Sequence, residues 1–251
     1  MNDVRAAVAI DDLVVAYGRR PVLRGISARL PQGQITAIVG PNGAGKTTLI
    51  DAIAGVRPPA SGTITHAGRC RPAYVVQRSE APDVLPISVR ATVSMGRWPV
   101  RGRWRRLTAH DRTVVEDCMH RLGIQDLADD QLGTLSGGQR QRVLVAQGLA
   151  QQADLLLLDE PATGLDLGAQ RGVEDAIRRY RADGGSVVRV THDLAVAMQA
   201  DHCVVLRDGT VAAAGDPAAV LTPEVVARTW GIPVLGAAAV PAGSAGRSGG
   251  E

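Results

Sequence analysis

The stretch that decides the fold is Gly40-Pro-Asn-Gly-Ala-Gly-Lys46-Thr47-Thr48, which fits the pattern G-x-x-x-x-G-K-[ST]. The apolar run before it, residues 34–40, is typical of a buried strand, and residues 46–54 are typical of a helix that stops at Gly55. Glycines let the backbone of such a loop curl with its N–H groups pointing inward, and the helix that follows adds its positive end. The pattern therefore predicts a phosphate site.

The residue types in this loop suit a nucleoside triphosphate bound with magnesium. Lys46 is expected to reach the β- and γ-phosphates, and the Thr47 hydroxyl is expected to bind Mg²⁺. The alternative is an ordinary glycine-rich loop, which the strand-loop-helix context disfavours. The predicted binding residues of the loop are Gly40, Pro41, Asn42, Gly43, Ala44, Gly45, Lys46, Thr47 and Thr48.

Two carboxylates, Asp159 and Glu160, follow a second apolar run at residues 155–158. They stand at the carboxyl end of a predicted buried strand, where the ligands of open α/β sheets bind. Asp159 is expected to hold the magnesium shell, and Glu160 is expected to polarise an attacking water as general base. The alternative is that both acids cap the turn that follows the strand.

Strands and helices alternate along most of the chain. Residues 8–39 contain three apolar, β-branched runs, and the runs DLLLLD, GGSVVRVT and DHCVVLRDG follow from Asp154 onward with helical stretches between them. This alternation favours a parallel sheet covered by helices. Between the two regions, residues 108–122 predict a helix with Thr108 as N-cap and Gly123 as stop. Residues 236–251 are rich in Ala, Gly and Ser and are expected to be disordered.

A second anion site is indicated by Leu135-Ser-Gly-Gly-Gln-Arg-Gln-Arg142, which precedes a helical stretch. Ser136 is expected to cap that helix, while Gly137 and Gly138 leave its N-terminal amides open. LSGGQ at this place, upstream of the acidic strand, resembles the signature of ABC ATPases, and the resemblance covers residues 8–235. The order and spacing of the motifs disfavour an ordinary loop.

The resemblance implies an α/β fold, a P-loop NTPase of ABC type with a mostly parallel core sheet, an antiparallel β subdomain and an inserted helical subdomain. Residues 1–235 would form one ATP-binding domain, with 1–76 and 141–235 as core and β part and 77–140 as the helical subdomain. It also implies a head-to-tail dimer. In that dimer the phosphate loop of one copy and the signature residues of the other enclose each ATP; these residues are Ser136, Gly137, Gly138 and Gln139.

Four further positions match the family one by one. Tyr17 resembles the aromatic residue that stacks on adenine, and Gln77 resembles the glutamine that senses the γ-phosphate and magnesium and links to the membrane partner. Asp166 lies in a segment that resembles the loop crossing between the copies, and His192 resembles the switch histidine that clamps the γ-phosphate. A lone Tyr or His is more often a core or surface residue, and the neighbouring motifs reverse those odds. The positions that depart from the family pattern without removing a catalytic group are Val76, Ala162 and Thr163.

Composition narrows the function further. The chain of 251 residues has 28 basic and 25 acidic side chains and a formal charge of +3, which argues against a wholesale nucleic-acid binder. Cys70, Cys118 and Cys203 lie far apart, which favours buried thiols over a zinc site or a redox pair. No apolar run approaches the eighteen residues of a membrane span, and the N-terminus lacks the pattern of a signal peptide. We therefore expect a chain that does not enter the membrane.

The segments around residues 74–79, 85–90, 93–98 and 106–112 resemble the metal-importer branch of the family, with zinc and manganese importers nearest and iron–siderophore importers next. The resemblance implies a peripheral subunit on the cytoplasmic side of the membrane. Its partners would be a second copy, permease subunits and an extracytoplasmic metal-binding protein. The alternatives are an export subunit and a soluble ABC-type ATPase acting on nucleic acid or ribosomes, and the single cassette without long heptads disfavours the latter.

The basic run from Arg97 to Arg106 carries two tryptophans and allows three interpretations. It could face the membrane subunit and lipid head groups, form a solvated surface, or bind single-stranded nucleic acid. We expect no nucleic-acid partner. The five histidines show no ligand spacing joined to cysteine or carboxylate, so the cargo of such a transporter would be recognised elsewhere.

Overall fold

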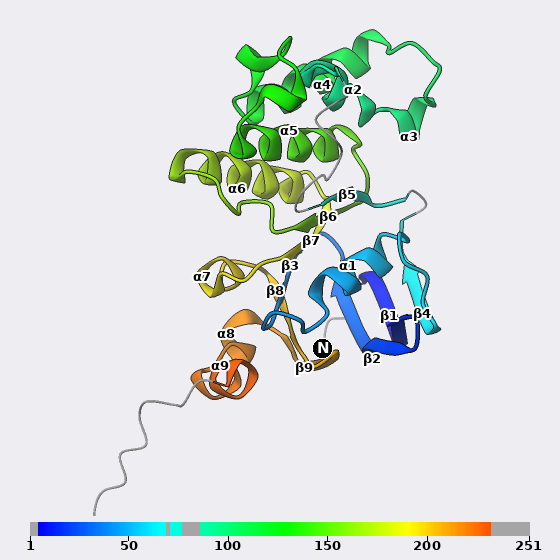
Figure 1. The fold of residues 1–251 in the computed structure, drawn as a ribbon, viewed down its shortest axis with the longest axis vertical. Coiled ribbons are helices and arrows are strands. Elements are labelled where there is room, and N and C mark those ends of the chain that lie inside the picture. Colours follow the sequence, from blue (N-terminus) through cyan, green and yellow to red (C-terminus); the bar gives the residue numbers. More distant parts are fainter. Residues whose placement is uncertain (1–4, 69–70, 77–85, 232–251) are drawn as a thin grey trace, which may run out of the picture.

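The computed structural model describes residues 5–68, 71–76 and 86–231, which form two sheets with helices packed around them (Figure 1). The strands are β1 Ala6–Tyr17, β2 Arg20–Pro31, β3 Ile35–Val39, β4 Ser61–His66, β5 Ala73–Val75, β6 Leu155–Asp159, β7 Ser186–Val190, β8 His202–Arg207 and β9 Thr210–Gly215. The helices are α1 Lys46–Ile53, α2 Val89–Met95, α3 Trp98–Arg101, α4 Ala109–Arg121, α5 Gly137–Ala150, α6 Leu167–Ala182, α7 Leu194–Ala197, α8 Pro217–Val220 and α9 Pro223–Trp230, with 3-10 turns η1 Gln125–Leu127 and η2 Leu132–Thr134. Our sequence predictions for Cys70, Gln77 and residues 236–251 lie outside the described residues.

The larger sheet has the strand order β5-β6-β7-β3-β8-β9, and its strands run parallel except for β9, which pairs antiparallel with β8. Leu156 and Leu158 of β6 join one buried cluster with α4, α5 and α6, whereas Leu155 and Leu157 join a second cluster with α1. Both faces of the strand are thus covered, which explains the continuous apolar run in the sequence. Because β6, β7 and β3 are parallel neighbours, their carboxyl ends meet at one edge of the sheet.

The smaller sheet is antiparallel, with the order β2-β1-β4. Alternate side chains of β2, including Leu23, Ile26 and Leu30, are fully buried against α1 and the parallel sheet, and their neighbours face solvent. The three strands predicted within residues 8–39 are confirmed as β1, β2 and β3. The predicted fold class is confirmed as well, since a mostly parallel sheet and an antiparallel sheet occur together.

Helices α2 and α4 pack against α5 at the end of the molecule opposite the antiparallel sheet (Figure 1). The same helix α5 also packs against α6 and β5 of the body. We propose the division into a helical part at 77–140 and a core at 1–76 and 141–235. The boundary between residues 140 and 141 falls within helix α5, so the two parts share this helix.

The predicted helix boundaries follow from local chemistry. Thr108 Oγ1 accepts a hydrogen bond from Asp111 N, and Asp111 Oδ2 accepts one from Thr108 N, which forms a capping box at the start of α4. Gly123 after α4 and Gly55 after α1 have φ values of 59° and 73°, in the left-handed region that favours glycine. These stops are confirmed.

Two further sequence predictions concern membrane-spanning helices and the burial of cysteines. The longest described helix, α6, has 16 residues, and within the described ranges no helix is both long and apolar enough to span a bilayer. Cys118 and Cys203 are buried, and burial raises the pKa of their thiols to about 11 and about 12. The prediction of buried thiols is confirmed for these two residues.

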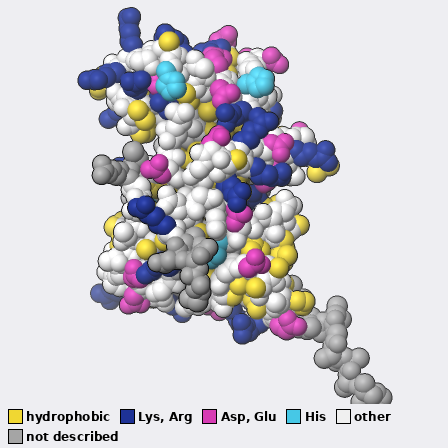
Figure 2. Space-filling model, turned by 180° about the vertical axis from the view of Figure 1, so that it is seen from behind, with side chains coloured by type: hydrophobic (Ala, Val, Ile, Leu, Met, Phe, Trp, Pro, Cys, Tyr) yellow, Lys and Arg dark blue, Asp and Glu magenta, His cyan; other side chains and the backbone are white. Residues whose placement is uncertain are grey.

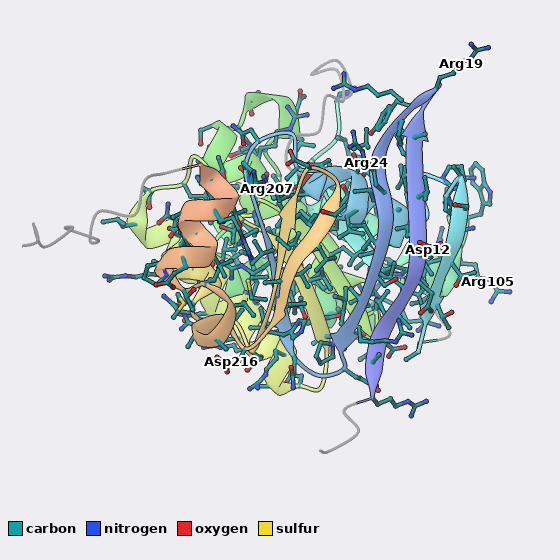
Figure 3. All side chains as sticks on the ribbon, turned by 90° about the horizontal axis from the view of Figure 1, so that it is seen from below. Asp12, Arg19, Arg24, Arg105, Arg207 and Asp216 are labelled. Carbon is teal, nitrogen blue, oxygen red and sulfur yellow. The ribbon has the colours of Figure 1, made fainter. Side chains whose placement is uncertain are left out.

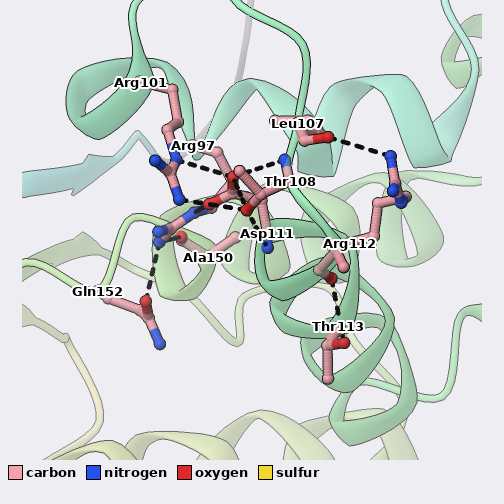
Figure 4. Close-up of polar contacts among 10 residues, drawn as sticks. Arg97, Arg101, Leu107, Thr108, Asp111, Arg112, Thr113, Ala150 and Gln152 are labelled. Atoms are coloured by element: carbon pink, nitrogen blue, oxygen red, sulfur yellow. Dashed lines mark hydrogen bonds and ion pairs between the residues drawn. The ribbon is translucent and has the colours of Figure 1, made fainter.

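The basic run contains two arginines that point inward (Figure 4). Arg97 donates from Nε to Asp111 Oδ1 at 3.0 Å and from Nη1 to the Ala150 carbonyl at 2.8 Å, while Arg101 Nε donates to Asp111 Oδ2 at 2.8 Å. The Asp111 side chain is fully buried. Its pKa is lowered first by the hydrogen bond from the Thr108 hydroxyl and further by both arginines, against an opposing effect of burial. The network ties α3 to α4 and α5.

Replacing Asp111 by Asn should leave two arginines without their carboxylate and lower the melting temperature by on the order of 5–10 °C near neutral pH. Because the folded-state pKa of Asp111 lies below its ordinary 3.8, this stabilisation is present above that pH and is lost as the pH falls through the folded pKa. Thermal unfolding followed by circular dichroism at several pH values measures the effect. Asp117→Asn is the matched control, since Asp117 is 52% exposed in a surface pair with Arg121. Equal melting temperatures for the two variants would refute the structural role of the network.

Candidate nucleotide site

The glycine-rich loop connects β3 to α1 and has the backbone that the sequence pattern predicts. Gly40, Gly43 and Gly45 have positive φ values of 152°, 80° and 99°. A Cβ atom on Gly40 would lie 2.2 Å from the carbonyl oxygen of Leu206, so no larger residue fits there without a shift of β8. Helix α1 begins directly after Gly45, and its positive end therefore faces the loop.

The Lys46 side chain folds back onto the first residues of this loop. Its Nζ atom donates to the carbonyl oxygens of Gly40 at 2.8 Å and of Pro41 at 3.0 Å, and the residue is 8% exposed. Burial lowers the pKa of Lys46, and the carboxylates of Glu160 and Asp159 oppose this shift. The predicted cation and the two predicted acids are thus within electrostatic reach of one another.

Asp159 is the last residue of β6 and is buried. Burial raises the pKa of its carboxyl, while a hydrogen bond from the Thr47 side chain acts in the opposite direction. Its Oδ1 atom is buried and has no hydrogen-bond partner among the described residues. A buried carboxylate oxygen without a donor, beside a threonine hydroxyl, is a set of hard oxygen ligands that fits Mg²⁺.

Glu160 follows in a strained conformation, with a positive φ of 47°. Its N–H group donates to the Val190 carbonyl at 3.1 Å, which fixes the residue to β7. The carboxylate accepts a hydrogen bond from Thr163 Oγ1 at 2.9 Å and lies 3.3 Å from His192 Nδ1. Glu160 and His192, predicted separately, therefore meet. The contact of Thr163 was missed, because the sequence identified that residue only as a departure from the family pattern.

The Ser136 segment forms the start of α5. Ser136 is the N-cap, as predicted, and its Oγ atom accepts a hydrogen bond from Gln139 N at 3.2 Å. The Gln139 side chain accepts one in return from Ser136 N at 2.9 Å, which completes a capping box that the sequence analysis did not identify. A Cβ atom on Gly137 would meet nothing within 4 Å among the described residues, so the helix N-terminus is open.

A groove of about 750 Å³ lies beside this helix start. It is lined by residues 136–142, by Leu144 and by residues 163–166 and Ala169 of the segment that leads into α6. Asp166 caps α6, since its Oδ1 atom accepts a hydrogen bond from Ala169 N at 2.8 Å. Among the described residues that line the groove, none belongs to the phosphate loop at 40–48. The two predicted anion sites are thus separate within one chain.

Tyr17, the predicted base-stacking residue, ends β1 and is 46% exposed. The guanidinium carbon of Arg57 lies 3.9 Å from the centroid of its ring. No sequence motif indicated this arginine, since its position just after the end of α1 was the only signal for it. Gln77, the remaining predicted site residue, lies outside the described residues.

A glycine-rich loop between a parallel strand and a helix, with two acids at the end of a second parallel strand, defines the class of P-loop nucleoside triphosphatases.

Comparison with known proteins narrows this class. A family profile described as ABC transporter matches residues 23–163. The zinc transport system ATP-binding protein TroB of Treponema pallidum is 37% identical over 231 residues, 90% of this chain and 87% of that protein. The manganese transport system ATP-binding protein MntB of Bacillus subtilis is 36% identical over 230 residues, 89% of this chain and 92% of that protein. A solved inward-facing metal-chelate type ABC transporter has a TM-score of 0.80 at 29% identity, covering 91% of this chain and 90% of that chain.

The chain belongs to the ATP-binding subunits of ABC transporters. Subunits of this family are ATPases coupled to transport, so nucleotide binding and ATP hydrolysis are the activity of this chain. The family that the LSGGQ motif indicated is confirmed.

Proposed function

We propose that this chain hydrolyses ATP between two head-to-tail copies and thereby drives the permease of a metal-ion importer. The observation that carries the proposal is the separation of two anion-binding helix starts within one chain. Helix α1 starts at the phosphate loop, whereas α5 starts at Ser136, in a groove whose described lining contains no residue of that loop. Each chain then offers two half-sites, and a second copy brings Ser136 to the nucleotide.

In this proposal the phosphate loop holds the triphosphate and Tyr17 stacks on the base. When the nucleotide binds, the Lys46 ammonium group gives up its hydrogen bonds to the two loop carbonyls and donates to β- and γ-phosphate oxygens instead. Thr47 and Asp159, together with Gln77, would hold Mg²⁺, and the unpaired Oδ1 of Asp159 supports this set. When bound, the ion would offset negative charge as the γ-phosphoryl group is transferred.

Glu160 is the proposed general base. Its carboxylate takes a proton from a water whose oxygen bonds to the γ-phosphorus, while the bond from that phosphorus to the bridging oxygen breaks to give ADP and phosphate. The strained backbone of Glu160 and the contacts of Thr163 and His192 hold the carboxylate at the edge of the sheet. The His192 side chain is 63% exposed and is proposed to turn toward the γ-phosphate.

The second copy completes the site with its Ser136 segment. We propose that the N-terminal amides of its α5, with Ser136, Gly137, Gly138 and Gln139, cover the γ-phosphate, and that Asp166 lies in the loop crossing between the copies. Residues 163–166 line the same groove as Ser136, and a Cβ atom on Gly138 would lie 3.2 Å from Leu165 Cδ2. This close packing supports one continuous contact surface.

Replacing Glu160 by Gln should leave ATP affinity within about twofold and lower turnover by on the order of a hundredfold or more, because the base is lost and the phosphate contacts remain. Steady-state hydrolysis and nucleotide titration measure the two effects. The variant should also accumulate as an ATP-bound dimer in size-exclusion chromatography. Full hydrolysis by this variant would rule out the assigned role.

Two inactive variants should restore activity when mixed. Lys46→Ala weakens nucleotide binding in its own phosphate loop, and Ser136→Arg blocks the second half-site with a long cation. A mixed dimer contains one intact composite site, formed by the loop of the Ser136→Arg chain and the signature of the Lys46→Ala chain. Hydrolysis by the mixture should exceed the sum of the separate variants at least several-fold. A purely additive rate would mean that one chain forms the whole site.

The proposed cargo is a zinc or manganese ion, and the support is the match to transport proteins named for these metals over about nine-tenths of the chain. Among the described residues no cluster of three His, Cys, Asp or Glu side chains could hold a metal. We propose that permease subunits and an extracytoplasmic metal-binding protein recognise the cargo. The second candidate is an importer of chelated iron, which a 34% identity to a ferric enterobactin transport ATP-binding protein of Escherichia coli supports.

The proposed location is the cytoplasmic side of the membrane, and the basic run offers a surface for it. Arg97 is buried and Arg101 is partly buried, but Trp104 is 95% exposed and Val100 is 59% exposed. Side chains of arginine project from this end of the molecule (Figure 2). We propose that this surface faces the membrane subunit and lipid head groups, whose charge and apolar border suit arginine and tryptophan.

Cells that lack this chain should take up less radioactive zinc or manganese. Wild-type chain should restore uptake, and Glu160→Gln, which should fold and bind ATP, should not. Uptake of a ferric siderophore by the same cells is the internal comparison. Normal metal-ion uptake with a loss of siderophore uptake would favour the second candidate and exclude the first.

A further inference from the structure

A cation and an aromatic ring meet at the end of α1 that lies away from the phosphate loop. Arg57 follows this helix, and its guanidinium carbon lies 3.9 Å from the centre of the Tyr17 ring. The N–H groups of Val56 and Arg57 both donate to the carbonyl oxygen of Asp51, at 3.0 Å and 3.3 Å. The backbone that carries the guanidinium is therefore fixed by the end of the helix.

The contact is specific for this pair of side chains. A planar guanidinium over an aromatic face is held by attraction to the ring electrons, and arginine stacks in this way better than lysine. The Arg57 Nε atom is buried and has no hydrogen-bond partner among the described residues. Tyr17 remains 46% exposed, so one face is covered by Arg57 while much of the ring is open to solvent.

The phosphate loop and the Arg57–Tyr17 pair lie at opposite ends of α1, as the γ-phosphate and the base lie at opposite ends of a nucleotide. Helix α1 has eight residues and is about 12 Å long, with Lys46 at its start and Arg57 just beyond its end. A nucleoside triphosphate carries its γ-phosphate and its base at opposite ends. With the γ-phosphate at the loop, a nucleotide extended along α1 brings its base to Tyr17.

We propose that Arg57 is a positioning residue for the base of ATP. It packs on one face of Tyr17 and holds the ring so that the opposite face stacks on the adenine. This inference rests on the proposed nucleotide site. Arg57 acts through Tyr17 and leaves the phosphate contacts unchanged.

The test compares ATP with inorganic tripolyphosphate, which carries the phosphates without a base. In the full chain, Arg57→Ala should raise the dissociation constant of ATP about five- to tenfold and leave that of tripolyphosphate within about twofold, as measured by titration calorimetry. The KM for ATP should rise with kcat unchanged. Arg57→Lys should fall between wild type and Arg57→Ala.

Arg19→Ala is the matched control, because it removes the same charge two residues from Tyr17. Arg19 is exposed and projects into solvent at the turn between β1 and β2 (Figure 3). This variant should bind ATP like the wild type. Since Arg57 acts through the ring, adding Arg57→Ala to Tyr17→Ala should cost no further affinity.

Three results would overturn the inference. Unchanged or tighter ATP binding by Arg57→Ala would mean that Arg57 does not support the ring or covers the face that the base needs. Equal losses for ATP and tripolyphosphate would indicate general damage to α1. Losses that add up in the double variant would separate Arg57 from Tyr17. A wild-type chain that bound tripolyphosphate but not ATP would instead refute the proposed nucleotide site itself.

Discussion

The parallel pairing of β6, β7 and β3 is the constraint on which the site depends. Val190 pairs with Asp159 on one side and with Ile38 on the other, so three strand ends are held in register. The Val190 carbonyl also accepts the N–H group of Glu160, and Ile38 accepts that of Thr191. A slip of one residue in either pairing would turn these side chains to the opposite face of the sheet. The glycine-rich loop and the two acids, Asp159 and Glu160, are therefore placed by main-chain bonds.

Main-chain amides at two helix starts are the basis of the two anion sites that we propose for one chain. The starts of α1 and α5 both present open amides, one after a glycine loop and the other after the capped Ser136. They belong to different parts of the fold, since α1 packs under the antiparallel sheet and α5 packs with α2, α4 and α6. Our proposal of a head-to-tail pair gives both helix ends the same ligand. It also makes ATP the contact that joins the copies.

Arginines that point into the protein are paired with carboxylates. Arg97 and Arg101 share the buried Asp111, and Arg189 on the buried strand β7 makes a double hydrogen bond to Glu174 of α6 at 2.8 and 2.9 Å. Arg97 and Arg189 are buried, and each has a carboxylate partner because an unpaired charge in the interior would be strongly destabilising. Only the remainder of the basic run is available to a partner surface. Composition alone could not separate these two groups of arginines.

The sequence by itself determined which residues we propose for the site: the glycine loop with Lys46, the acids Asp159 and Glu160, and the Ser136 segment each stand in a short pattern whose residues are close along the chain. It also determined the main strands and the ends of α1 and α4, since capping and glycine stops are local. Only the tertiary structure decided that Thr163 and His192 hold Glu160 and that Arg57 covers Tyr17. These contacts join separate elements, and their geometry follows from sheet register and packing, which no local pattern encodes.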